Sequence, residues 1–322
     1  LCARNASSRA WALMAAAKGL LGDTGECIRC YREALRANPR NVPAGAGLVI
    51  ALNEAGRPQE AAEALDRLLD AAPRSQVLLG LHFDRLVRED RQDDAIAVMK
   101  RRVALQPGNV SALLALGNLL LRAGRTAEAE RCLRDACGLR PDSPDAVAAL
   151  ALLLRQTGRA EEGLAVCDAF VTSCPGSPQA LLCRAHYLRS LGRLQQAEAD
   201  LRSLLRLHQK NAQALASLGD LAADAGDRQT ALARYREAAQ ADPAAREILA
   251  EKLLAMGSPQ GEREAEEIAD STLRQNPADV SALLLKSRIA MMRYEGLDEA
   301  ERFCRRAIEV APASIAAHAQ IS

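Results

Sequence analysis

Apolar and polar positions along this chain follow the pattern of two short amphipathic helices, repeated at a fixed step. The stretch 110–141, VSALLALGNLLLRAGRTAEAERCLRDACGLRP, shows the pattern most clearly, with a Gly-Arg turn between its halves. Apolar residues recur there three and four positions apart, as they do on one face of a helix. The same pattern returns along almost the whole chain at a step of 34 residues, which is the signature of a repeat array.

Two rows of helix-ending residues follow the same step. Proline cannot continue a helix and would stop the second helix of each repeat, whereas glycine would end the first in a left-handed conformation. The prolines are Pro39, Pro73, Pro107, Pro141, Pro175, Pro243 and Pro277, with Gln209 in the gap and Pro312 one residue late. The glycines are Gly22, Gly56, Gly124, Gly158, Gly192 and Gly226. Asp90 takes the third place in the glycine row, and Asp tolerates the left-handed conformation better than most residues.

A third row predicts where the first helix of each repeat begins. The residue two places after each proline position is a good N-cap type: Asn41, Ser75, Asn109, Ser143, Ser177, Asn211, Asp279 and Ser314. The rows together divide 8–312 into nine repeats, approximately 8–41, 42–75, 76–109, 110–143, 144–177, 178–211, 212–242, 243–279 and 280–314. Residues 1–7 match the end of a preceding repeat, and we expect them to be helical but loosely held. Residues 313–322 would begin a further first helix.

The large and small positions within each repeat match a known family. Repeat four carries Leu113, Leu116, Gly117, Gly124, Ala129, Leu133, Ala136 and Pro141 at positions 4, 7, 8, 15, 20, 24, 27 and 32. Repeat seven matches at the same positions with Leu215, Leu218, Gly219, Gly226, Ala231, Tyr235, Ala238 and Pro243. This pattern resembles the tetratricopeptide repeat family. The resemblance implies an all-α fold, a right-handed superhelical α-solenoid of helix-turn-helix repeats.

Repeat eight fits only when its first helix begins three residues early. Asp242 then becomes the N-cap, Pro243 the first helical residue, and Leu249 and Ala250 the buried pair. Gly257 would end that helix, and a turn over 258–261 would absorb the three residues before Ala265. Repeat nine carries one extra residue near 294–296, before Ala300.

Composition and charge remove several classes of function. The net charge of +1 gives no overall attraction to nucleic acid or to an anionic membrane, and no apolar run is long enough to span a bilayer. Aromatic residues make up only 2% of the chain, so Ala and Leu, which favour helices, must form the core. The nine cysteines follow no framework, which favours a reducing compartment such as the cytoplasm. Cys27 and Cys30 form a CxxC that we interpret as a buried structural pair.

No catalytic or cofactor-binding motif is present. The nucleotide-loop, metalloprotease and nucleophile-elbow patterns are missing, and the four histidines, His82, His186, His208 and His318, are far apart in the repeat pattern. His82 and Arg102 occupy positions that are normally apolar or small, and we interpret His82 as a hydrogen-bonded core histidine. We therefore expect no enzymatic activity, cofactor or metal within this chain.

The family resemblance implies that first helices line a concave groove, chiefly through positions 2, 5, 9, 12 and 13. The residues there that we expect to contact a partner are Arg88, Asn118, Arg122, Arg155, His186, Arg189, Asp220, Asp224, Glu247 and Glu251. Acidic partner residues are expected over repeats three to six, and basic ones over seven and eight. The arginines could instead serve only the helix dipole, because each lies in the last turn of its helix.

The favoured function is a protein-interaction scaffold that binds an extended peptide or partner segment, because a long solenoid without chemistry offers a binding surface. One alternative is the recruiting arm of a larger enzyme, such as a glycosyl- or sulfotransferase. A helical-repeat RNA binder would need a basic groove and ranks last. Apolar faces on the first and last helices also predict end-to-end self-association.

Overall fold

The computed structural model describes residues 2–255, 257–293, 296–311 and 319, with side chains from residue 7 onward. Over these residues the chain is all-α, with eighteen helices and no strand. They are α1 (Cys2–Leu20), α2 (Thr24–Ala37), α3 (Val42–Glu54), α4 (Pro58–Ala71), α5 (Gln76–Arg88), α6 (Gln92–Leu105), α7 (Val110–Arg122), α8 (Thr126–Leu139), α9 (Pro144–Gln156), α10 (Ala160–Ser173), α11 (Pro178–Ser190), α12 (Leu194–Leu207), α13 (Ala212–Asp224), α14 (Arg228–Ala241), α15 (Ala245–Ala255), α16 (Pro259–Gln275), α17 (Val280–Met291) and α18 (Leu297–Val310).

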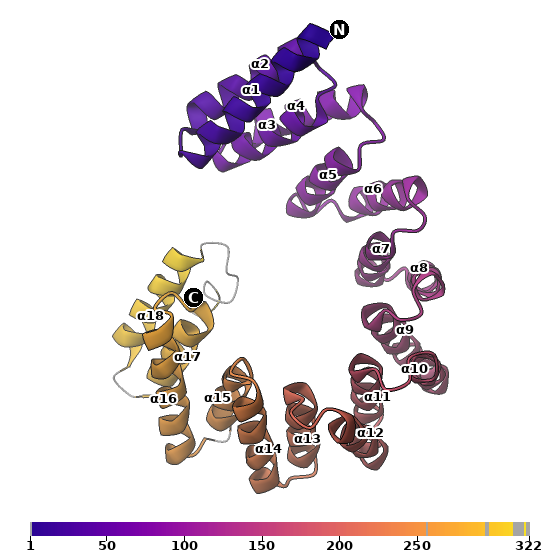
Figure 1. The fold of residues 1–322 in the computed structure, drawn as a ribbon, viewed down its shortest axis with the longest axis vertical. Coiled ribbons are helices and arrows are strands. Elements are labelled where there is room, and N and C mark those ends of the chain that lie inside the picture. The colour runs from indigo at the N-terminus through magenta and orange to yellow at the C-terminus, as the bar shows by residue number, and fades with distance from the viewer. Residues whose placement is uncertain (1, 256, 294–295, 312–318, 320–322) are drawn as a thin grey trace. The chain divides into compact units, whose positions relative to one another are not determined.

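The helices form nine pairs, one for each predicted repeat, and each pair is joined by a short turn (Figure 1). Odd-numbered helices are the first helix of a repeat and even-numbered helices the second. The chain divides into two compact units, residues 1–153 and residues 154–322, and the boundary falls inside α9. Within each unit a helix packs against its partner in the pair and against the helices of the next repeat.

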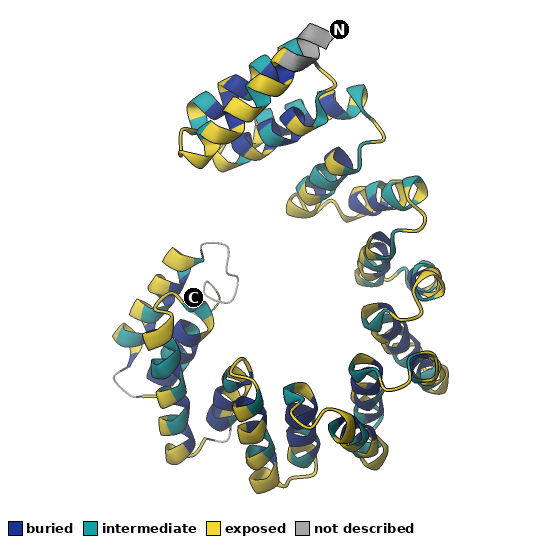
Figure 2. Cartoon of the chain, in the orientation of Figure 1, coloured by how far each residue is buried: buried dark blue, intermediate teal, exposed yellow. Residues whose placement is uncertain are grey.

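Each helix buries one stripe of apolar residues, chiefly Ala and Leu, against its neighbours (Figure 2). In α7, Leu113, Leu116 and Leu120 are all buried, as their spacing predicts. Glycine allows closer packing where a large side chain arrives from the second helix: a Cβ on Gly117 would lie 2.9 Å from the Leu133 side chain. Small residues at this position therefore let the two helices of a repeat come together.

The predicted helix ends are largely confirmed. Seven of the N-cap side chains accept a backbone N–H at the start of the following helix, among them Asn41 Oδ1 from Ala44 at 3.1 Å. The others are Ser75, Asn109, Ser143, Ser177, Asn211 and Asp279; Ser314 lies outside the described residues. All six predicted turn glycines have positive φ, and Asp90 adopts φ 54° in the same place.

Residues 2–7 are helical, but no turn separates them from the first repeat. They continue into the rest of α1, which runs unbroken to Leu20. The proline that stops other second helices is replaced by Asn5 one step before Pro39, so nothing interrupts the ladder of hydrogen bonds. Ser8 is buried in the first repeat and donates to the carbonyl of Ala34 at 2.7 Å.

The first helix of repeat eight does not begin at the predicted residue, Pro243, although other features of the early start are present. The helix α15 begins at Ala245, two residues after Pro243, and the Asp242 carboxylate accepts the N–H of Ala244 at 3.0 Å. Leu249 and Ala250 are buried, and Gly257 has φ 63°.

The predicted turn over 258–261 is wrong. Ser258 is the N-cap of α16 and Pro259 its first residue, a pair that favours helix initiation. The inserted residues lengthen this helix to 17 residues, where α14 has 14. In repeat nine, Tyr294 and Glu295 lie outside the described residues, and so does the segment 313–322 apart from Ala319.

Candidate partner-binding face

The ten residues predicted to contact a partner all lie on first helices. In unit 1 they are Arg88 on α5 and Asn118 and Arg122 on α7. In unit 2 they are Arg155 on α9, His186 and Arg189 on α11, Asp220 and Asp224 on α13, and Glu247 and Glu251 on α15.

The three residues of unit 1 are exposed. Arg88 donates through Nε to the backbone carbonyl of Asp84, four residues earlier on its own helix, at 3.4 Å. Asn118 and Arg122 make no hydrogen bond or ion pair with any residue that the structure describes. The helices α5 and α7 therefore present two guanidinium groups and one amide that are free to bind a ligand.

Arg155 in unit 2 is held by the next repeat. Its Nη1 donates to the carbonyl of Ser190, the last residue of α11, at 3.4 Å, where a cation also meets the negative end of the helix dipole. Its Nε is buried without a partner among the described residues. For this arginine the contact agrees with a helix-capping role.

His186 is exposed, and its Nε2 lies 2.8 Å from the Ser217 hydroxyl on α13. Desolvation and the nearby positive charge of Arg189 lower the pKa of His186 below its usual value. The ring is therefore neutral at pH 7, and the serine hydroxyl can donate to it or accept from it.

Arg189 joins the two acidic residues of the next repeat. Its Nη1 donates to Asp220 Oδ2 at 3.0 Å, and its Nε donates to Asp224 Oδ2 at 2.5 Å. Asp220 Oδ1 also accepts from the Tyr235 hydroxyl at 2.7 Å and from Lys252 Nζ at 2.8 Å. Burial alone would raise the pKa of Asp220, but hydrogen bonds from Lys252 and Tyr235 and the nearby cations lower it overall.

The remaining acidic candidates lie on α15. Glu251 Oε1 accepts from Arg288 Nη1 of α17 at 3.0 Å. Glu247 is exposed and has no hydrogen bond or ion pair within the described chain. Ion pairs thus join first helices of neighbouring repeats in unit 2: Arg189 of α11 pairs with Asp220 and Asp224 of α13, and Arg288 of α17 pairs with Glu251 of α15. The basic and acidic groups predicted from the sequence are therefore paired where α11 meets α13.

Sequence reasoning missed Lys252 and Tyr235, which complete the charge cluster around Asp220. A signal for Lys252 was available: Lys252 follows Asp220 by 32 residues, and Asp224 follows Arg189 by 35. Opposite charges separated by about one repeat on first helices face each other across neighbouring repeats. Scanning for that separation would have found both pairs.

A hollow of about 240 Å³ lies beside Arg88, between α3 and α4 on one side and α5 on the other. Its walls carry apolar side chains, including Val49 and Leu65, together with Asn53 and Arg85. Arg88 therefore lies at the edge of this cavity.

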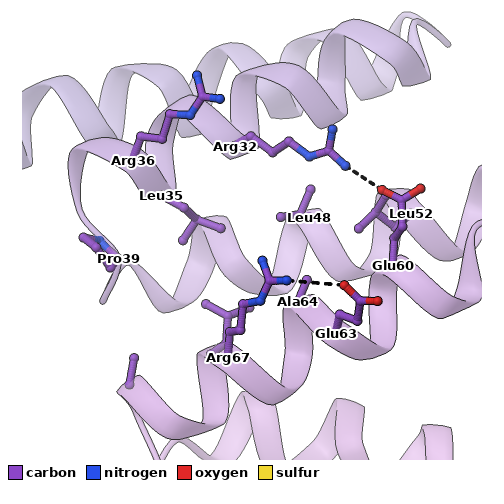
Figure 3. A pocket seen from close by; sticks show the side chains of 12 residues that line it. Arg32, Leu35, Arg36, Pro39, Leu48, Leu52, Glu60, Glu63, Ala64 and Arg67 are labelled. Atoms are coloured by element: carbon purple, nitrogen blue, oxygen red, sulfur yellow. Dashed lines mark hydrogen bonds and ion pairs between the residues drawn. The ribbon is translucent and has the colours of Figure 1, made fainter.

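A larger hollow of about 410 Å³ lies between the second helices α2 and α4 (Figure 3). Leu48 and Leu52 of α3 lie in its floor, and an Arg32–Glu60 ion pair of 2.8 Å lies at its rim. The arginines that line it, Arg32, Arg36 and Arg67, are each paired with a glutamate, so the rim offers no unpaired cation.

The other residues singled out in the sequence show no sign of reactive chemistry. Cys27 and Cys30 are buried as predicted, and desolvation raises the pKa of Cys27. His82 is half-buried, and its buried Nδ1 has no hydrogen-bond partner in the described chain, so the prediction that this histidine is hydrogen-bonded is wrong. Arg102 donates to the Gln76 side chain at 3.4 Å.

The described residues show neither a metal-binding cluster nor a membrane-spanning helix. They contain no group of three or more His, Cys, Asp or Glu side chains placed to hold a metal ion. Among the same residues, no helix combines the length and the apolar character that crossing a membrane requires.

Comparison with solved structures finds helical-repeat proteins at low sequence identity. A tetratricopeptide repeat protein from Parabacteroides merdae is 16% identical, with a TM-score of 0.49, over 77% of this chain and 99% of that one. The PilF protein of Pseudomonas aeruginosa is 19% identical, with a TM-score of 0.45, over 66% and 96%. The MamA protein is 20% identical, with a TM-score of 0.43, over 52% and 91%. A search of the curated proteins found no match.

Two family models match the sequence directly. Both are described as tetratricopeptide repeat: one matches residues 81–144, 114–178 and 184–255, and the other matches residues 21–81. The first alone covers more than half of the chain. These matches agree with the nine helix pairs, the confirmed caps and the turn glycines. The chain belongs to the tetratricopeptide repeat family, an all-α helical-repeat fold that generally serves protein–protein interaction.

Proposed function

We propose that this chain is a non-catalytic scaffold that binds an extended segment of a partner protein along its first helices. The observation that carries the proposal is the set of free polar groups on α5 and α7. Arg88 and Arg122 are exposed cations with no carboxylate partner in the part of the chain that the structure describes, and Asn118 offers an amide that is likewise unpaired there. An acidic stretch of polypeptide is the ligand that complements these groups.

The dimensions of the repeat support an extended ligand. Packed helices lie roughly 8–10 Å apart, and an extended peptide advances about 3.3 Å per residue. One repeat therefore spans about three ligand residues. An acidic side chain every three to four residues would meet Arg88 and then Arg122.

In unit 2 most of the candidate residues are already paired within the chain, so fewer of them can bind a ligand directly. Among the acidic candidates, Glu247 has no partner within the described residues and would take a basic ligand residue. Arg189, Asp220, Asp224 and Glu251 would bind a ligand only by exchanging an internal ion pair for an external one. Such an exchange yields little net free energy but restricts which sequences fit.

We also propose that the protein works in a reducing compartment. The described cysteines are free thiols and four of them are buried, which fits a reducing compartment. A self-associated form would use the apolar side chains exposed on α1 and in the turn that follows it, because Leu13, Leu20 and Leu21 are each more than two-thirds exposed.

The experiment is a selection of random 16-residue peptides displayed on phage against the full chain, followed by photo-crosslinking of an enriched peptide. We expect enrichment of acidic sequences and crosslinks to α5 and α7. Crosslinks confined to the second helices, such as α6 and α8, would contradict the proposal.

A further inference from the structure

Repeats three and eight differ from most other repeats in the residue at position ten of the first helix. In six other repeats this position holds a buried apolar side chain: Ala51, Leu119, Leu153, Tyr187, Leu221 and Ile289. Repeats three and eight carry Arg85 and Lys252 there instead. An apolar residue at this position packs toward the preceding repeat: Leu221 and Ile289 each belong to a hydrophobic cluster that includes residues of the repeat before. We call the space between a first helix and the preceding repeat the crevice.

In unit 1 the exchange leaves the crevice open. The Arg85 guanidinium extends towards α4, where it lies 3.0 Å from Asp66 Oδ1 and 3.3 Å from the carbonyl of Ala62. Its buried Nε has no hydrogen-bond partner among the described residues and lies 3.8 Å from Glu89 Oε1. The cavity of about 240 Å³ is lined on its apolar side by Val49, Ala61, Leu65 and Leu81.

In unit 2 the same exchange has the same result. Lys252 Nζ extends to Asp220 at 2.8 Å and lies 5.5 Å from the centroid of the Tyr235 ring. A cavity of about 290 Å³ lies there, between α13–α14 and α15, with Ala223, Ala231 and Ala255 among its walls.

The two cavities are built from matching positions. Positions 12, 17, 20 and 24 of the earlier repeat and positions 10 and 13 of the later one line both. In unit 1 these are Asn53, Pro58, Ala61, Leu65, Arg85 and Arg88, and in unit 2 they are Ala223, Arg228, Ala231, Tyr235, Lys252 and Ala255. A crevice thus lies beside a position-ten cation in each unit.

We propose that each of these cavities takes one aromatic side chain of a partner peptide. An apolar cavity of roughly 150 Å³ holds a benzene ring, so each cavity has room for a phenyl or phenol group. Apolar walls remove the ring from water, and the cation beside them contacts its face. The inference rests on the proposed peptide-binding function and adds the residue class that would anchor the peptide.

Charge and composition favour an aromatic ring over an aliphatic chain. Arg85 and Lys252 are both already paired with a carboxylate, so each can add a ring contact without giving up its charge partner. The chain itself has only eight aromatic residues, three Phe, four Tyr and one Trp. Aromatic side chains usually anchor interfaces, and here they must come from the partner.

The test uses N-acetylphenylalanine amide as the probe and the methyl resonances of the full chain as the readout. The probe is uncharged, so electrostatic attraction to the surface does not contribute. We expect saturable shifts at Ala61 and Leu65 in unit 1 and at Ala231 in unit 2, and much smaller shifts with N-acetylalanine amide.

A leucine side chain that fills the crevice should remove binding of the probe. Arg85→Leu restores the residue that repeats four and five carry, and should weaken binding at Ala61 by about tenfold or more while leaving Ala231 unchanged. Lys252→Leu should do the reverse. Arg101→Leu, which removes an exposed arginine of α6 without an ion pair in the described chain, is the matched control. Ala62→Leu fills the same cavity from α4 and introduces the leucine found at this position in repeats five and seven.

Three results would overturn the inference: no saturable shifts in the wild-type chain, equal shifts with the alanine probe, or undiminished binding in both Arg85→Leu and Ala62→Leu. If the pockets bind the probe but no extended peptide is selected, only the proposed function fails. If acidic peptides are selected and the probe does not bind, only this inference fails.

Discussion

Arg189 and Asp224 join successive first helices of unit 2 through two parallel hydrogen bonds. Nε lies 2.5 Å from Oδ2 and Nη2 lies 3.1 Å from Oδ1, a bidentate arrangement between α11 and α13. The contact lowers the pKa of the aspartate and raises that of the arginine. It ties one repeat to the next at the face where the sequence alone predicted separate basic and acidic groups.

A double-mutant cycle measures the coupling free energy between Arg189 and Asp224. Arg189→Gln and Asp224→Asn should each reduce the free energy of unfolding, and the coupling between them should be about 0.5–1 kcal/mol, because both side chains are about one-third exposed. Urea titrations monitored by circular dichroism provide the values. Arg122→Gln is the control and should have little effect, and a coupling of zero would show that the pair does not stabilise the fold.

Two glycines in first helices should respond oppositely to the same substitution. A Cβ on Gly47 would lie 2.3 Å from the Tyr31 ring, whereas a Cβ on Gly80 meets nothing closer than 4.0 Å. Gly80→Ala should therefore raise stability by up to about 1 kcal/mol through helix propensity. Gly47→Ala should lower it by about 1–3 kcal/mol, because the ring must move. Thermal melts of both variants measure these changes in stability. Equal effects would contradict the close contact between Gly47 and the Tyr31 ring.

Acid should weaken the contact between α16 and α17. Hydrogen bonds from Arg293 and Lys286 lower the pKa of Glu266 from its usual 4.5 to about 2. A carboxylate whose pKa is lower in the folded state contributes stability above pH 4.5 and loses it as the pH falls from about 4.5 towards 2. The contribution is at most about 3 kcal/mol, from 1.36 kcal/mol for each pKa unit.

Amide hydrogen exchange of α16 and α17 between pH 6 and pH 3 tests this loss. Glu266→Gln should reduce protection at pH 6 and remove most of its decline on acidification. Glu267→Gln, a neighbouring carboxylate with no ion pair in the described chain, should leave the profile unchanged. A wild-type profile that is flat to pH 3 would contradict the assignment.

The exposed apolar residues of α1 should promote self-association. Leu13 is 73% exposed and Leu20 is 91% exposed, and burying leucines of this kind releases roughly 1.5–3 kcal/mol each. The double variant Leu13→Lys/Leu20→Lys should shift light scattering at high protein concentration towards the monomer. A wild-type chain that stays monomeric up to millimolar concentration would exclude association through this surface.

Most of the fold could be predicted because the local rules repeat. The proline, glycine and N-cap rows fix each boundary several times over, so even the departure at Asp90 was recognised. The prediction was wrong at 258–261, where a serine–proline pair reads equally well as a turn and as a helix start. In this case the longer helix is favoured because Gly261 and Ala265 are both buried along it.

The candidate site was less predictable because its contacts depend on side-chain reach. The sequence placed Arg155 and Arg189 on the right helices but could not show that Arg155 extends to the Ser190 carbonyl or that Arg189 spans to α13. The pairing of Lys252 with Asp220 could be inferred from their separation of about one repeat, but the cavity beside Lys252 is apparent only in the structure. Charges on neighbouring repeats therefore have to be considered in pairs.

The affinity of Arg88→Glu/Arg122→Glu for a selected acidic peptide tests the central claim most directly. The matched control is Arg101→Glu/Arg131→Glu, which makes the same charge change on α6 and α8 of the same two repeats, again at exposed arginines without partners in the described chain. At low salt the first variant should bind at least about tenfold more weakly than wild type, the control should bind nearly as well, and the difference should shrink as salt screens the charges. Equal loss in both variants, or no loss in either, would contradict binding along the first helices.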